Sequence, residues 1–206
     1  MKFLDFIDEN LSKKEKHAVL SFGRLNPITK GHEKLVNKAK QIARQVGGTH
    51  HIVLSHSQDK NKNPLSPADK LKHAKRAFPN TNLSTSDKQN PNYLKQSAKL
   101  HKKGVTHLHV VAGSDRVPEF KNTLNKYNGT HSKALYNFKK VTVHSSGERD
   151  PDSQTTSGMS GTKMRGHAVK GDYKSFKSGA PSKMSDSHVK HMYNDTRKGM
   201  KIAEDV

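Results

Sequence analysis

The stretch HAVLSFGRLNPITKGHEKLVNKAKQIARQV, residues 17–46, decides the fold. It begins with a short apolar run over residues 17–22, which ends in Gly23 and is typical of a buried strand. Over residues 31–46 the apolar side chains recur at the period of a helix, and two glycines close that segment. The stretch therefore predicts a strand, a loop and a helix in that order.

The same alternation continues along the rest of the chain. Apolar runs predict strands over residues 51–55, 83–85, 106–112 and 138–144, and apolar periodicity predicts helices over 66–78, 92–103, 118–127, 160–170 and 186–197. We expect a polar loop over residues 145–158 and a short turn over 173–178. The order predicts an α/β fold: a Rossmann-like doubly wound parallel sheet, in a single domain with a C-terminal helical extension. Such sheets bind ligands at the carboxyl ends of their strands.

Length and composition limit the class of protein. A chain of 206 residues fits one domain, and we expect an N-terminal helical lead over 1–16, the main domain over 17–181 and a C-terminal helix over 182–206. The absence of Cys excludes disulfide scaffolds, thiolate zinc sites and Cys nucleophiles. No stretch approaches the ~18 apolar residues of a membrane span, and acids interrupt the apolar N-terminus. We expect a soluble, cytoplasmic protein without a membrane partner.

The charge is strongly positive and unevenly distributed. Lys and Arg number 38 against 18 Asp and Glu, which gives a formal net charge of +20. Residues 60–103 hold eleven Lys or Arg and only two acids, a field that would attract nucleotides, polyphosphates or nucleic acid. A solvated Lys-rich surface explains the same pattern equally well, because the lysines stand at helix-surface spacing and are not interleaved with aromatic residues as in a single-strand binder. Either way, we expect Lys70, Lys72 and Lys75 to be exposed.

The first candidate site lies where the first strand meets the first helix. Thr29, Lys30, Gly31 and His32 stand at the predicted helix start. A helix start offers backbone amides and a positive dipole, Gly31 permits close approach of a ligand, and His32 adds a donor for a phosphate oxygen. The alternative is an ordinary turn in which His32 is a surface or capping residue.

The second candidate site opens the helix after the polar loop. Ser160 or Thr162 can cap the first turn, and Lys163 and Arg165 add positive charge to the same terminus. A capped amphipathic helix with basic surface residues is the alternative. In a doubly wound sheet the two helix starts would face one another across the carboxyl ends of the strands, which favours a shared phosphate site.

Both segments resemble the signature motifs of a known superfamily. GRLNPITKGH, residues 23–32, is similar to the H/T-x-G-H motif of the nucleotidyltransferases, and SGTKMR, residues 160–165, is similar to their S-x-T-x-x-R motif. The nicotinamide mononucleotide adenylyltransferases are the most similar group, and Thr29 stands where most of them have His. The resemblance covers residues 17–181 and implies a Rossmann-like fold. In its style of sequence the chain also resembles phage-encoded members.

The resemblance implies a reaction and roles for individual residues. It implies transfer of an adenylyl group from ATP, or of another nucleotidyl group from its triphosphate, to a small phosphorylated acceptor such as nicotinamide mononucleotide. Pyrophosphate leaves, and Mg²⁺ is the expected cofactor. The implied catalytic residues are Thr29, His32, Lys163 and Arg165, and the implied nucleotide-binding residues are Gly23, Arg24, Lys30, Gly31, Gly113, Asp115, Ser160, Gly161 and Thr162. Capping of the helix near Pro118 is an alternative role for Asp115.

Two further possibilities remain open in the sequence. The chain could retain a nucleotidyltransferase fold but act as a basic nucleic-acid-binding or virion structural protein, since its charge suits either function. Its histidines include His107 with His109, and His188 with His191, at spacings that can suit a transition metal. Without Cys or a nearby carboxylate pair, we expect surface or half-buried histidines and no metal ligands. His188 and His191, one helical turn apart, are the pair to check first.

Overall fold

The computed structural model describes residues 15–147 and 159–202. Most of the predicted helical lead and of the predicted polar loop lies outside these residues. The elements are β1 (His17–Gly23), α2 (Lys30–Gln45), β2 (Thr49–Leu54), α3 (Pro67–Ala77), β3 (Leu83–Thr85), α4 (Tyr93–Lys102), β4 (His107–Ala112), the 3-10 turn η1 (Ser114–Arg116), α5 (Val117–Lys126), β5 (Lys140–Ser145), α6 (Gly161–Val169), α7 (Tyr173–Ser178) and α8 (Asp186–Gly199). In the part of the chain described, no helix is both long enough and apolar enough to cross a membrane.

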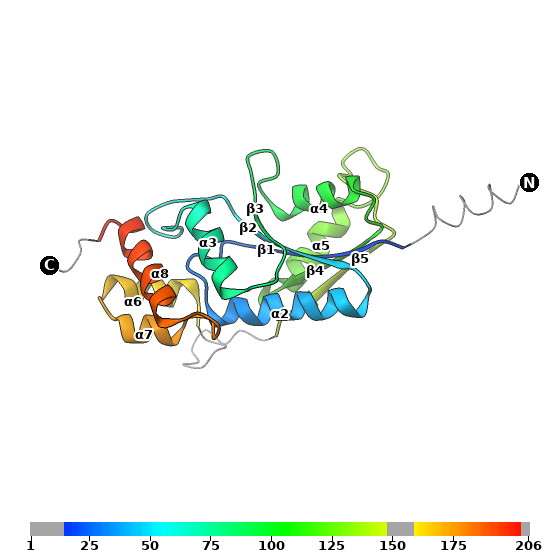
Figure 1. Ribbon diagram of the computed structural model, residues 1–206. Coiled ribbons are helices and arrows are strands. Elements are labelled where there is room, and N and C mark those ends of the chain that lie inside the picture. The colour runs from blue at the N-terminus through cyan, green and yellow to red at the C-terminus, as the bar shows by residue number, and fades with distance from the viewer. Residues whose placement is uncertain (1–14, 148–158, 203–206) are drawn as a thin grey trace, which may run out of the picture.

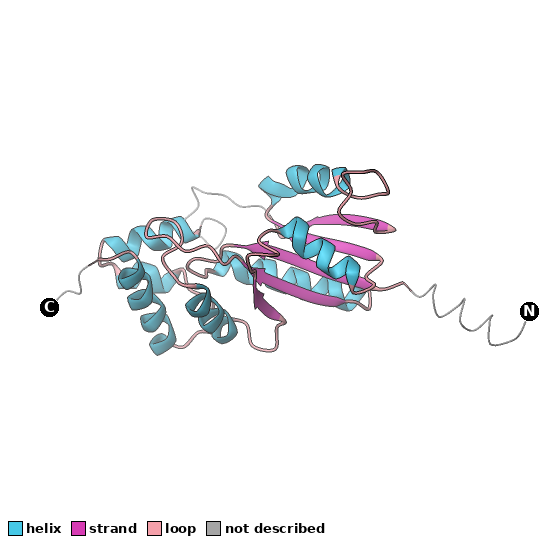
Figure 2. Ribbon diagram, turned by 90° about the horizontal axis from the view of Figure 1, so that it is seen from above, coloured by secondary structure: helices cyan, strands magenta, loops and turns pink. Residues whose placement is uncertain are grey.

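The five strands form one parallel sheet in the order β3-β2-β1-β4-β5. The strands lie side by side in Figure 2. The order runs outward from β1 in both directions, so the switch point lies between β1 and β4. The predicted Rossmann-like doubly wound sheet is therefore confirmed.

Alternate residues of each strand feed two separate cores. Val19 of β1 and Ile52 of β2 face the core beneath α2 and α3. Their chain neighbours Ala18 and Val53 face the core beneath α4 and α5. In Figure 1, α2 lies on one side of the sheet, and α4 and α5 lie on the other. Burial on both faces explains why the strands are apolar without alternation.

Helices α6, α7 and α8 gather at the carboxyl ends of the strands (Figure 1). Met192 and Tyr193 of α8 are buried in the same core as α2 and α3. Asp195 Oδ2 of α8 lies 2.9 Å from Nε2 of His73 in α3, and Arg197 Nη1 donates to the Ala168 carbonyl at 2.8 Å. The C-terminal helix thus packs into the main core.

Residues 173–178 form the helix α7, so the predicted short turn was wrong. Asp172 caps this helix, because its Oδ1 accepts a hydrogen bond from the Ser175 amide at 3.0 Å. Phe176 is fully buried and anchors the helix to the core. A six-residue helix offers too short a pattern for apolar periodicity to detect.

Lys70 is fully buried, so the prediction of an exposed lysine was wrong at this position. Its Nζ donates to the carbonyls of Ser55 and Ser57, the latter at 2.9 Å. Burial lowers the pKa of Lys70 to about 8, because the charged ammonium loses its water. Lys72 and Lys75 are exposed, as predicted.

Candidate functional site

A cavity of about 240 Å³ opens at the carboxyl ends of β1 and β4. Its walls come from the loop after β1, the start of α2, the segment after β4 and the start of α6. The structure brings eleven of the thirteen predicted site residues to its lining: Gly23, Arg24, Thr29, Gly31, His32, Gly113, Asp115, Ser160, Gly161, Thr162 and Arg165. The two predicted residues outside the lining are Lys30 and Lys163.

The start of α2 is held by a reciprocal capping box. Thr29 Oγ1 accepts from the His32 amide at 3.4 Å, and the Thr29 amide donates to His32 Nδ1 at 3.0 Å. Because Nδ1 accepts that bond, the proton of a neutral His32 ring sits on Nε2. Thr29 is only 1% exposed, so its structural work is to orient His32. His32 takes part in the predicted capping and also lines the cavity, and its role toward a phosphate oxygen stays a prediction.

The start of α6 is built in a similar way. Ser160 Oγ accepts from the Lys163 amide at 3.1 Å and caps the helix. Arg165, one turn along, donates from Nη1 to the Asn26 carbonyl at 2.7 Å and from Nη2 to Thr162 Oγ1 at 3.1 Å. These two bonds fix the plane of the guanidinium at the edge of the cavity.

Two glycines allow the helix starts to lie against one another. A methyl group added at Gly31 would come within 3.2 Å of the Met159 carbonyl oxygen. One added at Gly161 would come within 3.1 Å of the Asn26 carbonyl oxygen. Both separations are tight for a side chain. The predicted juxtaposition of the two helix starts is therefore present, and glycine is what permits it.

Asn26, in the loop between β1 and α2, joins this loop to two other segments through hydrogen bonds, a role that the sequence analysis missed. It is buried, with Nδ2 donating to the Leu65 carbonyl at 3.1 Å and Oδ1 accepting from the Leu65 amide at 3.0 Å. Its backbone carbonyl accepts from Arg165. Asn26 thus ties the segment before α3 and the start of α6 to one loop, which no local pattern could indicate.

Positive charge dominates the cavity. Burial, and secondly the neighbouring Arg24, lower the pKa of Arg165, although a guanidinium stays charged at neutral pH. Among the lining residues Asp115 is the single acid. Neither η1 nor α5 has a side-chain cap, so the capping alternative for Asp115 is wrong. Two close guanidinium groups repel one another, and a bound anion would relieve that repulsion.

Sequence reasoning also missed three cations of the lining, Lys34, Lys62 and Arg116. Lys62 is held by a turn in which Asp59 Oδ1 accepts the Lys62 amide at 2.6 Å. That bond, followed by the Asn63 side chain, lowers the pKa of Asp59 to about 2. Arg116 directly follows the predicted Asp115, which was the available signal. The sequence around Lys62 contained no such signal, because Lys62 is far from both motifs in the sequence and reaches the cavity only in the folded chain.

The position of the cavity defines the class of protein. Doubly wound parallel sheets bind nucleotides and phosphates where the strand order reverses, and here that point carries two capped helix starts and several cations. The cavity therefore lies where α/β proteins of this type bind phosphates. The sequence model of the family described as cytidylyltransferase-like matches residues 20–167, and the chain belongs to that family. The predicted nucleotidyltransferase class is thereby confirmed.

A solved structure shares this fold. The crystal structure of a bifunctional NMN adenylyltransferase/ADP ribose pyrophosphatase from Francisella tularensis superposes with a TM-score of 0.55 at 12% sequence identity. The match covers 91% of this chain and 53% of that protein, so this chain spans about half its length. At this identity the likeness extends to the fold alone. No curated protein matches the chain in sequence.

Proposed function

We propose that the protein transfers a nucleotidyl group, preferably the adenylyl group of ATP, to a small phosphorylated acceptor such as nicotinamide mononucleotide. The observation that carries the proposal is the pair of capped helix starts that lie against one another around a cationic cavity. Two such termini offer more amide donors and positive charge than one phosphate group requires. A triphosphate is the natural ligand of this arrangement.

The proposed reaction is an in-line displacement at phosphorus. An oxygen of the acceptor phosphate forms a bond to the α-phosphorus, and the bond from that phosphorus to the oxygen bridging the β-phosphate breaks. The bonding electrons leave with pyrophosphate. No protein nucleophile takes part, so catalysis comes from positioning and from stabilising negative charge.

The residues of the cavity suit those two tasks. His32 presents a proton on Nε2, and the capping box keeps its ring in one orientation. Arg165 has a fixed guanidinium plane, which can contact two oxygens of the triphosphate together. Arg24 is exposed and adds a further positive charge to the cavity. We assign the α-phosphate to His32 and the leaving phosphates to the start of α6.

Mg²⁺ fits this donor set. The ion keeps several waters in nucleotide sites and is bound by one or two carboxylates together with phosphate oxygens. Asp115 supplies one carboxylate in the cavity, and it is exposed and without a capping role. The ion would neutralise triphosphate charge. Asp115 would hold it through its water shell.

Apolar side chains of the lining support a site for the nucleobase. Phe22, Leu35 and Phe120 contribute to the cavity besides the charged residues. Phe120 is also covered by Arg116, whose guanidinium carbon lies 4.6 Å from the ring centroid. A base needs such flat apolar surroundings beside the polar phosphate subsites. Nicotinamide mononucleotide is preferred as acceptor because the structural neighbour is named for that activity.

Pyrophosphate release tests the proposal. The full chain would be assayed with each of the four ribonucleoside triphosphates against a panel of phosphorylated acceptors that includes nicotinamide mononucleotide. We expect release with ATP and one acceptor, and loss in His32→Ala. His191→Ala, which removes an exposed histidine of α8, is the matched control. Absence of release with every pair would exclude the proposed reaction.

The alternative function is nucleic-acid binding, which the net charge of +20 favours. The lysines do not form one track, however. Lys72 and Lys75 lie on α3, against the core of α2, whereas Lys95 and Lys99 lie on α4, against the opposite core. Retention on DNA across a salt series distinguishes this function from transfer of a nucleotidyl group.

A further inference from the structure

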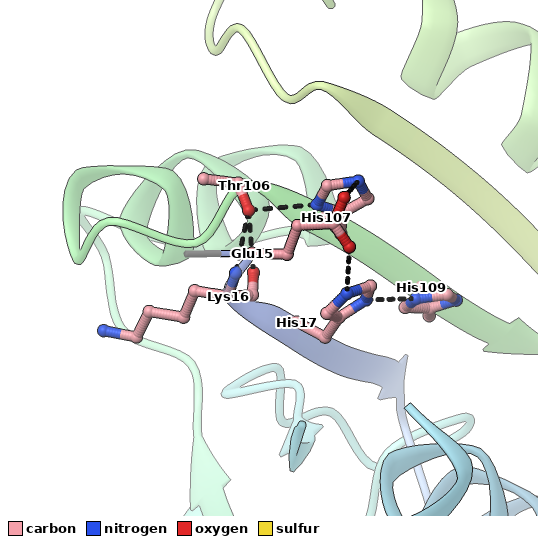
Figure 3. Close-up of polar contacts among 6 residues, drawn as sticks. All are labelled: Glu15, Lys16, His17, Thr106, His107 and His109. Atoms are coloured by element: carbon pink, nitrogen blue, oxygen red, sulfur yellow. Dashed lines mark hydrogen bonds and ion pairs between the residues drawn. The ribbon is translucent and has the colours of Figure 1, made fainter. Parts of the chain in front are cut away.

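A second polar cluster lies at the amino ends of the strands, away from the nucleotide cavity. His17 begins β1, His107 begins β4, and the two residues stand in register as neighbours in the sheet. Glu15 precedes β1. Figure 3 shows its carboxylate between the two imidazole rings. Within the described ranges 15–147 and 159–202, this is the group of three whose ligand atoms all lie within 4.8 Å of one another.

The distances in this cluster suit a small metal ion. Glu15 Oε2 lies 3.2 Å from His17 Nε2, and Glu15 Oε1 lies 3.6 Å from His107 Nε2. In a tetrahedral zinc site, ligand atoms about 2.0–2.1 Å from the metal lie about 3.3 Å from each other. The two observed separations bracket that value but involve different carboxylate oxygens, and the three ligand atoms lie within 4.8 Å of one another. The His17 and His107 rings are stacked with centroids 4.5 Å apart, so both would turn toward a common ion on binding.

The outer nitrogen of each imidazole already has a partner. His17 Nδ1 lies 3.1 Å from His109 Nε2, and His109 Nδ1 lies 3.0 Å from His144 Nε2. His107 Nδ1 lies 3.0 Å from Thr106 Oγ1. Histidines that bind metals almost always donate their second ring N–H to a carboxylate, a backbone carbonyl or water, which fixes the ring and its tautomer. An imidazole nitrogen and a Thr hydroxyl take that place here. Here both rings have that support.

The hydrogen bonds of Thr106 are consistent with this role. Its Oγ1 accepts from the Lys16 amide at 2.9 Å and can donate to the Lys16 carbonyl, at 3.4 Å. One acceptor lone pair remains, and an Nδ1–H of His107 would complete the set. The ammonium of Lys16 is turned away from the carboxylate, since its Nζ donates to the Lys103 carbonyl at 2.8 Å (Figure 3).

We propose that Glu15, His17 and His107 bind a divalent transition-metal ion of the zinc class, through one carboxylate and two Nε2 atoms. Two imidazoles and a carboxylate are a donor set that zinc accepts, with the fourth position open to water. The side chain of Glu15 is 60% exposed, against 18% for His17 and 11% for His107, so an ion enters from the carboxylate side. This proposal replaces the expectation of no metal ligands.

The hydrogen bonds from His17 through His109 to His144 can form both with and without a bound ion. Without an ion, His17 donates from Nε2 to the carboxylate at 3.2 Å, and His17 Nδ1 accepts from His109. His107 Nε2 lies 3.6 Å from the same carboxylate. With an ion, both Nε2 atoms offer lone pairs, and His17 donates through His109 toward His144. Donor and acceptor exchange roles in the bonds between His17, His109 and His144, and both bonds are kept. The ion would tie the segment before β1 to β4 at the amino ends of the strands, away from the nucleotide cavity, so the site is independent of the proposed transfer reaction.

Metal content tests the proposal directly. The full chain without a purification tag would be stripped with a chelator, then titrated with Zn²⁺, and with Co²⁺ for its visible spectrum. We expect one ion per chain and a tetrahedral Co²⁺ spectrum. Removal of a ligand in His17→Gln or His107→Gln should weaken binding by more than about 100-fold, which is the upper effect of removing an outer partner. The double variant His188→Gln/His191→Gln, which removes two histidines of α8, should bind as the unmodified chain does.

Two milder variants keep the test decisive if a histidine variant fails to fold. Glu15→Gln changes an exposed side chain and should abolish tight Zn²⁺ binding. Thr106→Val should weaken it about 10- to 100-fold, because His107 loses its outer partner. The proposal is overturned if Zn²⁺ affinity is unchanged in Glu15→Gln. It is equally overturned if the α8 double variant lowers the stoichiometry as much as His107→Gln does.

Discussion

The two ends of the central sheet carry two different kinds of polar site. At the carboxyl ends, capped helix starts and arginines make a cavity for anions. At the amino ends, imidazoles and a carboxylate make a cluster that suits a cation. The six residues of β4, at about 3.3 Å each, separate these ends by about 20 Å. The same sheet thus holds opposite charge preferences without interference.

The difference lies in what positions the side chains. At the carboxyl ends each site is local: Thr29 orients His32 three residues away, and Ser160 caps the helix that carries Arg165. At the amino ends the partners come from strands about ninety residues apart, and register alone unites them. Local sites leave motifs in the sequence, whereas sites made by register do not.

The largest effect should follow from His32→Ala. We expect turnover to fall about 100- to 1,000-fold, or ~3–4 kcal/mol, because a donor to developing charge acts mainly in the transition state. Steady-state pyrophosphate release measures this. The free energy of unfolding should change by only about 0.5–2 kcal/mol, the usual value of a missing cap. Unchanged turnover would remove His32 from the mechanism.

Arg165→Lys comes next. An ammonium acts as a point charge and cannot keep the bonds to Asn26 and Thr162 while contacting two phosphate oxygens. We expect kcat/KM for the triphosphate to fall about 10- to 100-fold, since bonds to charged groups contribute ~1.5–3 kcal/mol. Arg116→Lys, at an exposed position of the same cavity, is the matched comparison and should cost less. Equal effects would mean that the fixed guanidinium plane is unimportant.

Both His32 and Arg165 were predicted from the sequence, and so was most of the fold. In the part of the chain that the structure describes, the five strands and every α-helix except α7 were predicted to within a few residues, because apolar runs and caps are local signals. Of the thirteen predicted site residues, all but Lys30 and Lys163 line the cavity. The position of Lys62 in the lining and the hydrogen bonds by which Asn26 joins three segments were missed. Their positions depend on loops that return to the cavity from other parts of the fold.

Lys70 is a different case, because its signal was present. It precedes His73, Ala74 and Ala77 by three, four and seven residues, and all four are buried on one face of α3. Lys70 was predicted to be exposed because lysine is charged, although its spacing matched the buried face of α3. The cluster of Glu15 with His107 had no such signal, since these two residues are far apart in the sequence and only the pairing of β1 with β4 unites them.

Replacing Lys70 by Met should give an intermediate effect, on stability rather than turnover. The carbonyls of Ser55 and Ser57 lose their donor, which costs about 1–3 kcal/mol at neutral pH. With a folded pKa of about 8, below the 10.5 of an ordinary lysine, Lys70 is protonated more in the unfolded chain between these values. The stability it contributes therefore rises as pH increases through that range.

Urea unfolding at several pH values measures both effects. The difference in unfolding free energy between the unmodified chain and Lys70→Met should grow from pH 8 toward pH 10. Lys72→Met, at an exposed position of the same helix, should show neither the destabilisation nor the pH dependence. A flat difference would mean that the Lys70 ammonium stays charged in the folded protein.

The smallest effect on turnover should come from charges that belong to neither end of the sheet. Lys72→Gln/Lys75→Gln removes two exposed ammonium groups of α3, and neither lines the cavity. Exposed charges beyond about 10 Å are screened at 0.1 M salt, so turnover should stay within about twofold. If DNA binds to this face, the slope of log affinity against log salt should decrease by about 2, because each lysine that neutralises a phosphate adds about one unit to that slope. Lys95→Gln/Lys99→Gln on α4 is the matched pair from the opposite face. A large decrease in turnover from either pair would mean that the field of the whole molecule, and not the two helix starts, draws the triphosphate to the carboxyl end.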